Sequence, residues 1–200
     1  LAGTSAGKAA ILGALDDAVA GARPGDTLIF SFAGHGDQDK ASGRYFLTPS
    51  DFDRADIAGT SLAWADVAHV LEKAKARVVV ILDACHSGLS GAEQSGASPG
   101  TNDDAVEAIL SRRQAPMLVL AASKGRQVSY EHQRWGGGLF TYALVEALQK
   151  SRAAHDTDHD GVIEASELYR AVKGIVAARS RGLQTPWLAR RDLIGDFALF

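Results

Sequence analysis

Apolar side chains recur at helical spacing in four stretches of this chain. In the first stretch Ile11, Leu15 and Val19 lie four positions apart, and a Pro-Gly pair then ends the pattern. Such spacing places the apolar side chains on one face of a helix. We therefore expect amphipathic helices over residues 5–21, 61–76, 139–151 and 166–179.

Short apolar runs lie between these predicted helices. Residues 27–32, 77–82 and 117–121 are apolar or β-branched nearly throughout, and polar loops are expected after the first two, at 33–37 and 83–88. Such continuous runs are typical of strands that are covered on both faces. The alternation of strands and helices predicts a three-layer α/β sandwich with a mostly parallel central sheet. In such sheets, sites form beyond the carboxyl ends of the strands.

The composition is that of an ordinary globular protein. The 200 residues are 46% hydrophobic and 22% charged, and the formal net charge of −3 gives no basic excess. We therefore expect neither a nucleic acid nor an anionic membrane surface as a partner. No apolar run approaches the roughly 18 residues that a membrane-spanning helix needs.

The chain contains one cysteine, Cys85. A single thiol forms no internal disulfide. One cysteine is compatible with a protein of a reducing compartment and with a thiol enzyme, and the cysteine count alone does not decide between these two explanations. The chain opens on Leu1 in place of Met, which indicates a processed or trimmed piece of a longer chain. A cytoplasmic location is the expectation, with export as the alternative if a signal was removed.

Two predicted strands end close to residues that suit thiol chemistry, His35 after the first and Cys85 after the second. A cysteine peptidase needs a thiolate that attacks a carbonyl carbon and a proton donor for the departing amine. The amides of Gly36 and Cys85 are candidate donors to the oxyanion. The alternative for Cys85 is a small buried apolar residue. His86 is expected to orient its loop, and the alternatives are a second base or a ligand.

At this point the chain resembles the caspase-like cysteine peptidases (peptidase C14), in their metacaspase and bacterial orthocaspase branch. Cys85 follows His35 by 50 residues, as in caspases, and Asp83 stands where the animal signature has Gln. The matching motifs, which cover nearly the whole chain, are Ser-Phe-Ala-Gly-His-Gly at 31–36, Asp-Ala-Cys-His-Ser-Gly at 83–88, Gln-Val-Ser-Tyr-Glu at 127–131, Gly-Leu-Phe-Thr at 138–141 and Gln-Thr-Pro-Trp at 184–187.

The resemblance implies a role for each of five residues. Cys85 is the nucleophile, His35 is the acid/base, and the amides of Gly36 and Cys85 bind the oxyanion. Asp83 and Glu131 line a pocket for a basic P1 side chain, so the implied substrates are proteins or peptides cleaved after Arg or Lys. The alternatives are that Asp83 only caps the turn that follows it and that Glu131 is a solvated charge.

The resemblance also implies how the chain is organised. The expected parts are one domain over residues 1–200, a large-subunit-like part at 1–88, a linker at 89–115 and a small-subunit-like part at 116–200. Self-cleavage is expected after Arg112 or Arg113, although two arginines also serve to solvate a helix end. We expect a monomer. The strand and helix that normally open this fold have no counterpart before Leu1, so the sheet is expected to be incomplete.

A second motif lies between the last two predicted helices and fits the twelve-residue loop of an EF-hand. Oxygen ligands in this pattern suit Ca²⁺, and Gly161 at the sixth position allows the sharp turn. The alternative is an acidic surface loop with a helix cap at Ser166, and a bound ion would be either structural or regulatory. The predicted calcium ligands at positions one, three, five, seven and twelve are Asp156, Asp158, Asp160, Val162 and Glu167.

Three classes of function compete for this chain. The leading hypothesis is a cysteine endopeptidase that cleaves after Arg or Lys. The second is a catalytically silent relative that serves as a calcium-binding interaction module. The third is another thiol enzyme, but a phosphatase of the Cys-x5-Arg type is excluded because the sixth residue after Cys85 is Gly91. A serine hydrolase is unsupported as well, because no Gly-x-Ser-x-Gly motif surrounds Ser87 or Ser90.

Overall fold

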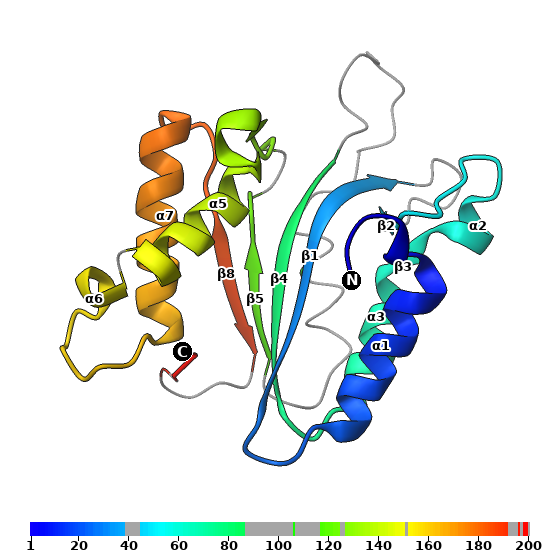
Figure 1. Ribbon diagram of the computed structural model, residues 1–200, viewed down its shortest axis with the longest axis horizontal. Helices are drawn as coiled ribbons and strands as arrows, with labels where there is room; N and C mark the ends of the chain where they lie inside the picture. Colours follow the sequence, from blue (N-terminus) through cyan, green and yellow to red (C-terminus); the bar gives the residue numbers. More distant parts are fainter. Residues whose placement is uncertain are drawn as a thin grey trace.

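The computed structural model has a six-stranded sheet at its centre and helices on both faces of that sheet (Figure 1). These three layers confirm the predicted α/β sandwich. The described residues are 1–38, 45–86, 106, 117–124, 127–150, 152–191, 196 and 198–199.

The sheet has parallel strands in its centre and antiparallel strands on both sides. β1, β4 and β5 run parallel, whereas β2 and β8 run antiparallel to their neighbours β1 and β5. A separate hairpin pairs β6 (Glu131–His132) with β7 (Gly137–Gly138). In spatial order, the strands of the large sheet are β3 (Leu62–Ala63), β2 (Tyr45–Thr48), β1 (Thr27–Gln38), β4 (Arg77–His86), β5 (Met117–Ala121) and β8 (Trp187–Arg191).

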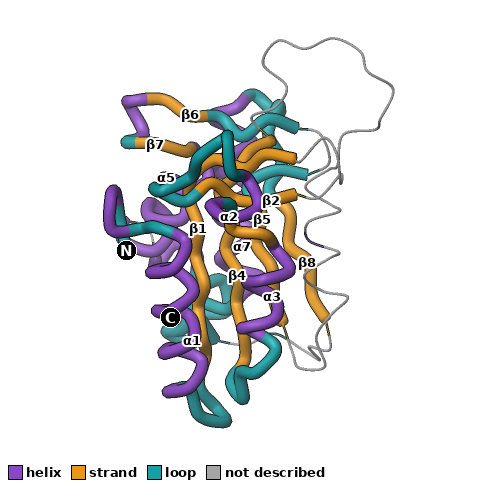
Figure 2. The backbone as a smooth tube through the Cα atoms, turned by 90° about the vertical axis from the view of Figure 1, so that its right-hand side faces the viewer, coloured by secondary structure: helices purple, strands orange, loops and turns teal. Residues whose placement is uncertain are grey.

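Two hydrophobic cores lie on opposite faces of the sheet. α1 (Lys8–Gly21) and α3 (Trp64–Leu71) cover one face, and α5 (Leu139–Val145) and α7 (Ala165–Ser180) cover the other (Figures 1 and 2). Successive side chains of a strand point to opposite faces, which is why Val80 of β4 lies in the first core and Val79 in the second. The smaller elements are η1 (Gly3–Ser5), α2 (Ile57–Thr60), η3 (Gln133–Trp135), the π-helical η4 (Glu146–Lys150) and α6 (Arg152–His155).

The strands that carry the predicted reactive residues are longer than their apolar runs. β1 continues to Gln38 and β4 continues to His86, so the loops predicted directly after residues 32 and 82 are wrong. The reason is backbone pairing. Residues 33–36 of β1 pair with residues 83–86 of β4, and this backbone pairing continues both strands although the side chains are small or polar.

The other predicted helices and strands are confirmed with changed boundaries, whereas β8 and the short strands β3, β6 and β7 were not predicted. α3 begins at Trp64 because Leu62–Ala63 pair with β2. β8 lies in the stretch after the last helix, where no strand is predicted because only three apolar residues precede its two arginines. None of the described helices is long and apolar enough to cross a membrane.

One edge of β1 is only partly paired. β2 pairs with β1 at His35–Gln38, and among the described residues no strand pairs with this edge over residues 27–34. The incomplete sheet that the resemblance implies stays a prediction.

The first turn of α1 is capped by a residue from elsewhere in the chain. The amide of Lys8 donates a hydrogen bond of 2.9 Å to Oδ1 of Asp51. The residue before the helix, Gly7, has no side chain, and a Cβ there would lie 2.7 Å from the Asp51 carboxylate. Asp51 therefore replaces the local N-cap side chain that most helices use.

We expect Asp51→Ala to lower the free energy of unfolding by about 1 kcal/mol, because the Lys8 amide loses its acceptor. Urea denaturation measures the change. The matched control is Asp17→Ala, at an exposed position within α1, where the free energy should change by less than about 0.5 kcal/mol. Equal losses in the two variants would contradict the capping role.

Candidate functional site

The carboxyl ends of β1 and β4 lie side by side and contain the two residues predicted to react. In the parallel register of these strands His35 is the partner of Cys85, and Gly36 is the partner of His86. Neighbouring strands lie about 4.8 Å apart, so the backbones of His35 and Cys85 are adjacent. The side chain of His35 is exposed, whereas the side chains of Cys85 and His86 lie outside the described part of the structure.

β2 holds the other side of this strand end. The hydroxyl of Thr48 donates a hydrogen bond of 3.1 Å to the carbonyl oxygen of His35. Gly36 is buried, and a Cβ at this position would overlap the phenol of Tyr45. Close approach of Tyr45 therefore requires glycine next to His35. The amide of Gly36, a predicted oxyanion donor, belongs to the strand and not to an open loop.

Asp83 lies two residues before Cys85, and its side chain is only 6% exposed. Its Oδ2 accepts hydrogen bonds from the amide of Thr141 at 3.0 Å and from the hydroxyl of Thr141 at 2.5 Å. Burial raises the pKa of Asp83, the two Thr141 hydrogen bonds oppose this shift, and the charge of Glu131 adds to it. These hydrogen bonds tie Asp83 to the first turn of α5.

Glu131 lies in β6 and is exposed. Its Cα partner is Gly138, and a Cβ on Gly138 would overlap the carboxylate of Asp83. The structure therefore brings the two predicted pocket carboxylates to the same turn. Among the described residues, no Lys or Arg forms an ion pair with either carboxylate.

A set of amide side chains holds the segment that precedes Glu131. Gln184 is fully buried, accepts a hydrogen bond from the amide of Tyr130 at 2.9 Å, and donates one to the carbonyl of Ala122 at 2.9 Å. Gln127 accepts a hydrogen bond from the amide of Thr185 at 2.9 Å. Both glutamines belong to motifs that carry the family resemblance, but their pairing across the two motifs was not predicted.

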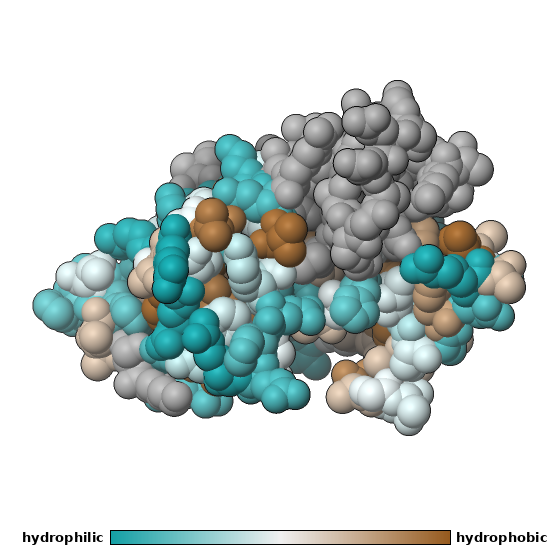
Figure 3. Space-filling view, turned by 90° about the horizontal axis from the view of Figure 1, so that it is seen from above, coloured by the Kyte–Doolittle hydropathy of each residue, from teal (hydrophilic) through white to brown (hydrophobic). Residues whose placement is uncertain are grey.

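The surface above the carboxyl ends of the strands is mainly hydrophilic in its described part (Figure 3). Near Glu131, Val128 is 57% exposed and Tyr130 is 37% exposed. This segment thus presents apolar side chains next to a carboxylate, a combination that suits contact with a peptide.

The acidic loop between α6 and α7 gathers its carboxylates. Asp156, Asp158 and Glu167 each offer an oxygen, and these oxygens lie within 4.8 Å of one another. Asp158, Asp160 and Glu164 form a second group that meets the same limit. Glu164 was not predicted as a ligand, although it occupies the ninth loop position, where an EF-hand residue often binds through water.

The backbone of this loop bends around the side chains. The amide of Gly161 donates to Oδ2 of Asp156 at 2.9 Å, and the amide of Asp160 donates to Oδ1 of Asp156 at 3.1 Å. The amide of Val162 donates to Oδ1 of Asp160 at 2.8 Å. Gly161 has a φ of 86°, which permits the sharp turn expected at the sixth position. The donor set is made of oxygens, so these residues fit a hard cation such as Ca²⁺.

The last loop position is buried in the first turn of α7. Oε1 of Glu167 accepts hydrogen bonds of 2.6 Å from both the amide and the hydroxyl of Thr157, and these bonds lower the pKa of Glu167 to about 2. The hydrogen bond between Glu164 and Glu167 raises the pKa of Glu164 to about 7. Crowded carboxylates of this kind repel one another unless a proton or a cation lies between them.

Ala198 and Leu199 pair with the loop. The amide of Leu199 donates a hydrogen bond of 2.9 Å to the carbonyl of Ile163. Next to it, Glu164 and Ala198 form an antiparallel β-bridge. Ile163 is 1% exposed and belongs to the core between the sheet and α7. The loop is therefore held both by the core and by a second piece of backbone.

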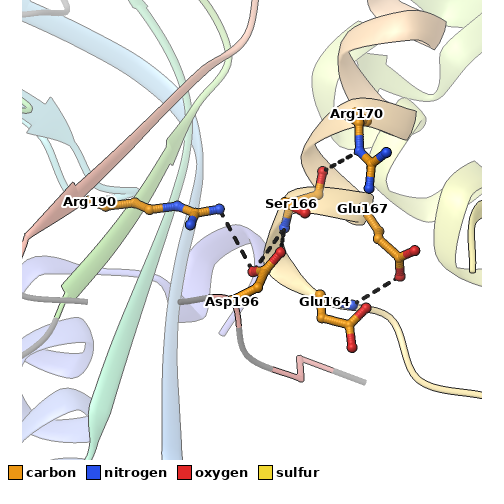
Figure 4. Close-up of polar contacts among 6 residues, drawn as sticks. All are labelled: Glu164, Ser166, Glu167, Arg170, Arg190 and Asp196. Carbon is orange, nitrogen blue, oxygen red and sulfur yellow. Dashed lines mark hydrogen bonds and ion pairs between the residues drawn. The ribbon is translucent and has the colours of Figure 1, made fainter. Parts of the chain in front are cut away.

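Asp196 connects the start of α7 to the sheet (Figure 4). Its two carboxylate oxygens each accept from the amide of Ser166 at 3.2 Å. Oδ1 of Asp196 also lies 3.7 Å from Nη2 of Arg190 in β8. Ser166, the predicted helix cap, thus contributes its backbone amide while Asp196 supplies the capping carboxylate.

Several predictions fall on residues outside the described part of the structure. They concern the linker at 89–115, of which only Val106 is described, and the self-cleavage site at Arg112 or Arg113.

Comparison with known protein families found one match. A family model described as a caspase domain matches residues 4–198. The search among curated proteins found no match.

Comparison with solved structures found similar folds at low sequence identity. The crystal structure of a protein from Geobacter sulfurreducens is similar with a TM-score of 0.63 and 18% identity, over 95% of this chain and 75% of that chain. The crystal structure of caspase-1 from Spodoptera frugiperda is similar with a TM-score of 0.49 and 15% identity, over 90% of this chain and 66% of that chain. At 18% identity, the similarity to the Geobacter sulfurreducens protein concerns the fold alone.

We expect Gln184→Ala to lower the free energy of unfolding by about 3 kcal/mol, because it leaves the amide of Tyr130 and the carbonyl of Ala122 without their buried partner. Chemical denaturation measures this loss. Gln127→Ala, at a partly buried position, is the matched control and should cost about 1 kcal/mol. A Gln184 variant as stable as the Gln127 variant would contradict the predicted role of the buried amide.

Proposed function

The chain belongs to the caspase domain family, whose members are cysteine proteases, and on that premise we propose that it is a cysteine endopeptidase with Cys85 as nucleophile. The single observation that best supports this proposal is the register of β1 and β4, in which His35 and Cys85 are partners. The presence of Asp83 where animal caspases have Gln favours the metacaspase and bacterial branch.

The proposed reaction proceeds in two stages. The Cys85 thiolate attacks the carbonyl carbon of the scissile bond, and the imidazolium of His35 donates a proton to the departing amine. Water, deprotonated by His35, then releases the acyl group from the thiol. The amides of Gly36 and Cys85 are the proposed donors to the oxyanion in both stages. The exposed side chain of His35 is open to a substrate, which this role requires.

The proposed specificity is for Arg or Lys at P1. Two observations support it, namely the closeness of Asp83 to Glu131 and the lack of a described basic partner for either. A basic substrate side chain would supply the missing positive charge. Self-processing after Arg112 or Arg113 follows from the same preference and belongs to this proposal.

We further propose that the loop at 156–167 binds Ca²⁺. The supporting observations are the two groups of carboxylate oxygens and the sharp turn at Gly161. The ion would be held by Asp156, Asp158, Asp160, Glu167 and the carbonyl of Val162, with Glu164 as an additional ligand. Calcium would supply charge neutralisation at the start of α7, and no step of peptide hydrolysis needs it.

We expect the protein to hydrolyse fluorogenic peptides that end in Arg or Lys and to leave the matched Asp peptide intact. Cys85→Ala should abolish the activity because the nucleophile is lost, a decrease of at least about 1,000-fold. Initial rates at pH 7 to 8 measure both effects.

The control for this experiment is Asp17→Ala, an exposed change on α1 that should leave the rates unaltered. Hydrolysis that persists in Cys85→Ala would contradict the proposed nucleophile. Absence of turnover with every peptide, in a protein that still melts cooperatively, would favour the silent interaction module instead.

We expect calcium at 100 times its dissociation constant to stabilise the protein by about 2.7 kcal/mol, and thus to raise the melting temperature by several degrees. Asp156→Ala should remove this shift because the first ligand position is lost. Differential scanning fluorimetry in calcium and in a chelator measures the shift.

Asp17→Ala, which removes one carboxylate outside the loop, should keep the calcium shift. Identical melting of the wild type in calcium and in chelator would rule against the ion site. Peptide hydrolysis under the same two conditions then separates a regulatory ion from a structural one.

A further inference from the structure

One short turn contacts the segments of both predicted pocket carboxylates. This turn, Gly138 to Thr141, consists of the last residue of β7 and the first three residues of α5. Gly138 is the register partner of Glu131, and the amide of Leu139 donates a hydrogen bond of 2.8 Å to the carbonyl of Tyr130. Thr141 contacts Asp83 on the neighbouring side. The turn thus fixes the relative position of two segments that lie far apart in the sequence.

Thr141 makes a stronger contact with Asp83 than a backbone amide alone provides. Its hydroxyl lies 2.5 Å from Oδ2 of Asp83, and its amide lies 3.0 Å from the same oxygen. A hydroxyl at this distance from a carboxylate is a charge-assisted hydrogen bond. Both bonds use Oδ2, and among the described residues no donor is bonded to Oδ1. Oδ1 is therefore the oxygen left for a ligand.

The environment of Asp83 makes this contact necessary. Asp83 is only 6% exposed and lies near a second acidic group, Glu131, and both conditions disfavour the charged form of its carboxylate. The hydroxyl and the amide of Thr141 lower the pKa of Asp83 and so favour the charged form. A pocket that attracts a cation needs this charge. The amide is present whatever residue stands at 141, whereas the hydroxyl depends on Thr141.

We propose that Thr141 is a positioning residue for the basic P1 side chain, because its hydroxyl anchors Oδ2 of Asp83 while Oδ1, which accepts no hydrogen bond from the described residues, would bind Arg or Lys. Thr141 touches neither the scissile bond nor the reactive thiol in this proposal. It acts through Asp83 alone. The inference rests on the proposed pocket for a basic P1 residue, and it assigns to α5 a part in substrate choice.

The test is a binding measurement that needs no turnover. Peptides that end in Arg or in Gln, labelled with a fluorophore, are titrated with the Cys85→Ala protein and followed by fluorescence anisotropy. Thr141→Val, which removes the hydroxyl and keeps the shape, should weaken binding of the Arg peptide by about tenfold and leave the Gln peptide unchanged. Thr141→Ser, which keeps the hydroxyl, should restore most of the loss.

Kinetics of the protein with an intact Cys85 give a second readout. Thr141→Val should raise KM for the Arg peptide by about tenfold with little change in kcat, since the reacting groups are untouched. The matched control is Thr27→Val, the same substitution at the amino end of β1, which should change neither constant. A purely structural role of Thr141 would instead lower the fraction of active protein for every peptide alike.

Several outcomes would overturn the proposal. Thr141→Val would contradict the proposal if it left binding of the Arg peptide unchanged, or if it weakened binding of the Arg and Gln peptides equally. Either result would show that the Thr141 hydroxyl does not help to bind the P1 side chain. Equal binding of the two peptides by the parent Cys85→Ala protein would overturn it together with the basic pocket. In that case the protein with an intact Cys85 would still support the proposed peptidase activity if it hydrolysed other peptides. Failure of the Thr141 proposal is therefore distinguishable from failure of the proposed peptidase activity.

Discussion

The parallel pairing of β1 with β4 is the interaction on which the rest of the molecule depends. It runs from Thr27 and Arg77 to Gly36 and His86, and its first half is apolar and lies between the two cores. The side chains in its second half are polar or small, so only the pairing of the backbones continues the strands there. Because side chains alternate along a strand, a slip of one residue would turn every side chain of β1 to the opposite face. The same ladder therefore sets the packing of the cores at one end and places His35 beside Cys85 at the other.

Remote carboxylates attach the helices to this sheet. Asp51 bonds to the first turn of α1, Asp83 to that of α5, and Asp196 to that of α7. The helices α1 and α5 both follow a glycine, Gly7 or Gly138, which offers no capping side chain. Each of these helices thus obtains a partner for its unpaired amides only when the tertiary structure forms. At Asp83 the cap coincides with the proposed substrate pocket, so helix capping and specificity draw on one side chain.

Sequence patterns predicted what depends on local or repeated features. The three parallel strands and the main helices follow from apolar spacing, and the proposed roles of His35 and Cys85 follow from their motifs. The ends of β1 and β4, the strand β8 and the contact of Thr141 with Asp83 depend on residues that meet only in the folded chain. Periodicity carries no information about such partners. For the same reason the regular spacing of the acidic residues at 156–167 was visible in the sequence, whereas the pairing of this loop with residues 198–199 was not.

The position of β8 has a consequence for synthesis on the ribosome. β5 pairs with β4 on one side and with β8 on the other, yet β8 is made only after the hairpin, α5, the acidic loop and α7. During that interval the apolar strand β5 has an open edge, and open apolar edges readily pair with other chains. The acidic loop likewise waits for Ala198 and Leu199, which follow β8. Chaperone binding to the nascent chain would therefore matter most between the emergence of β5 and that of β8.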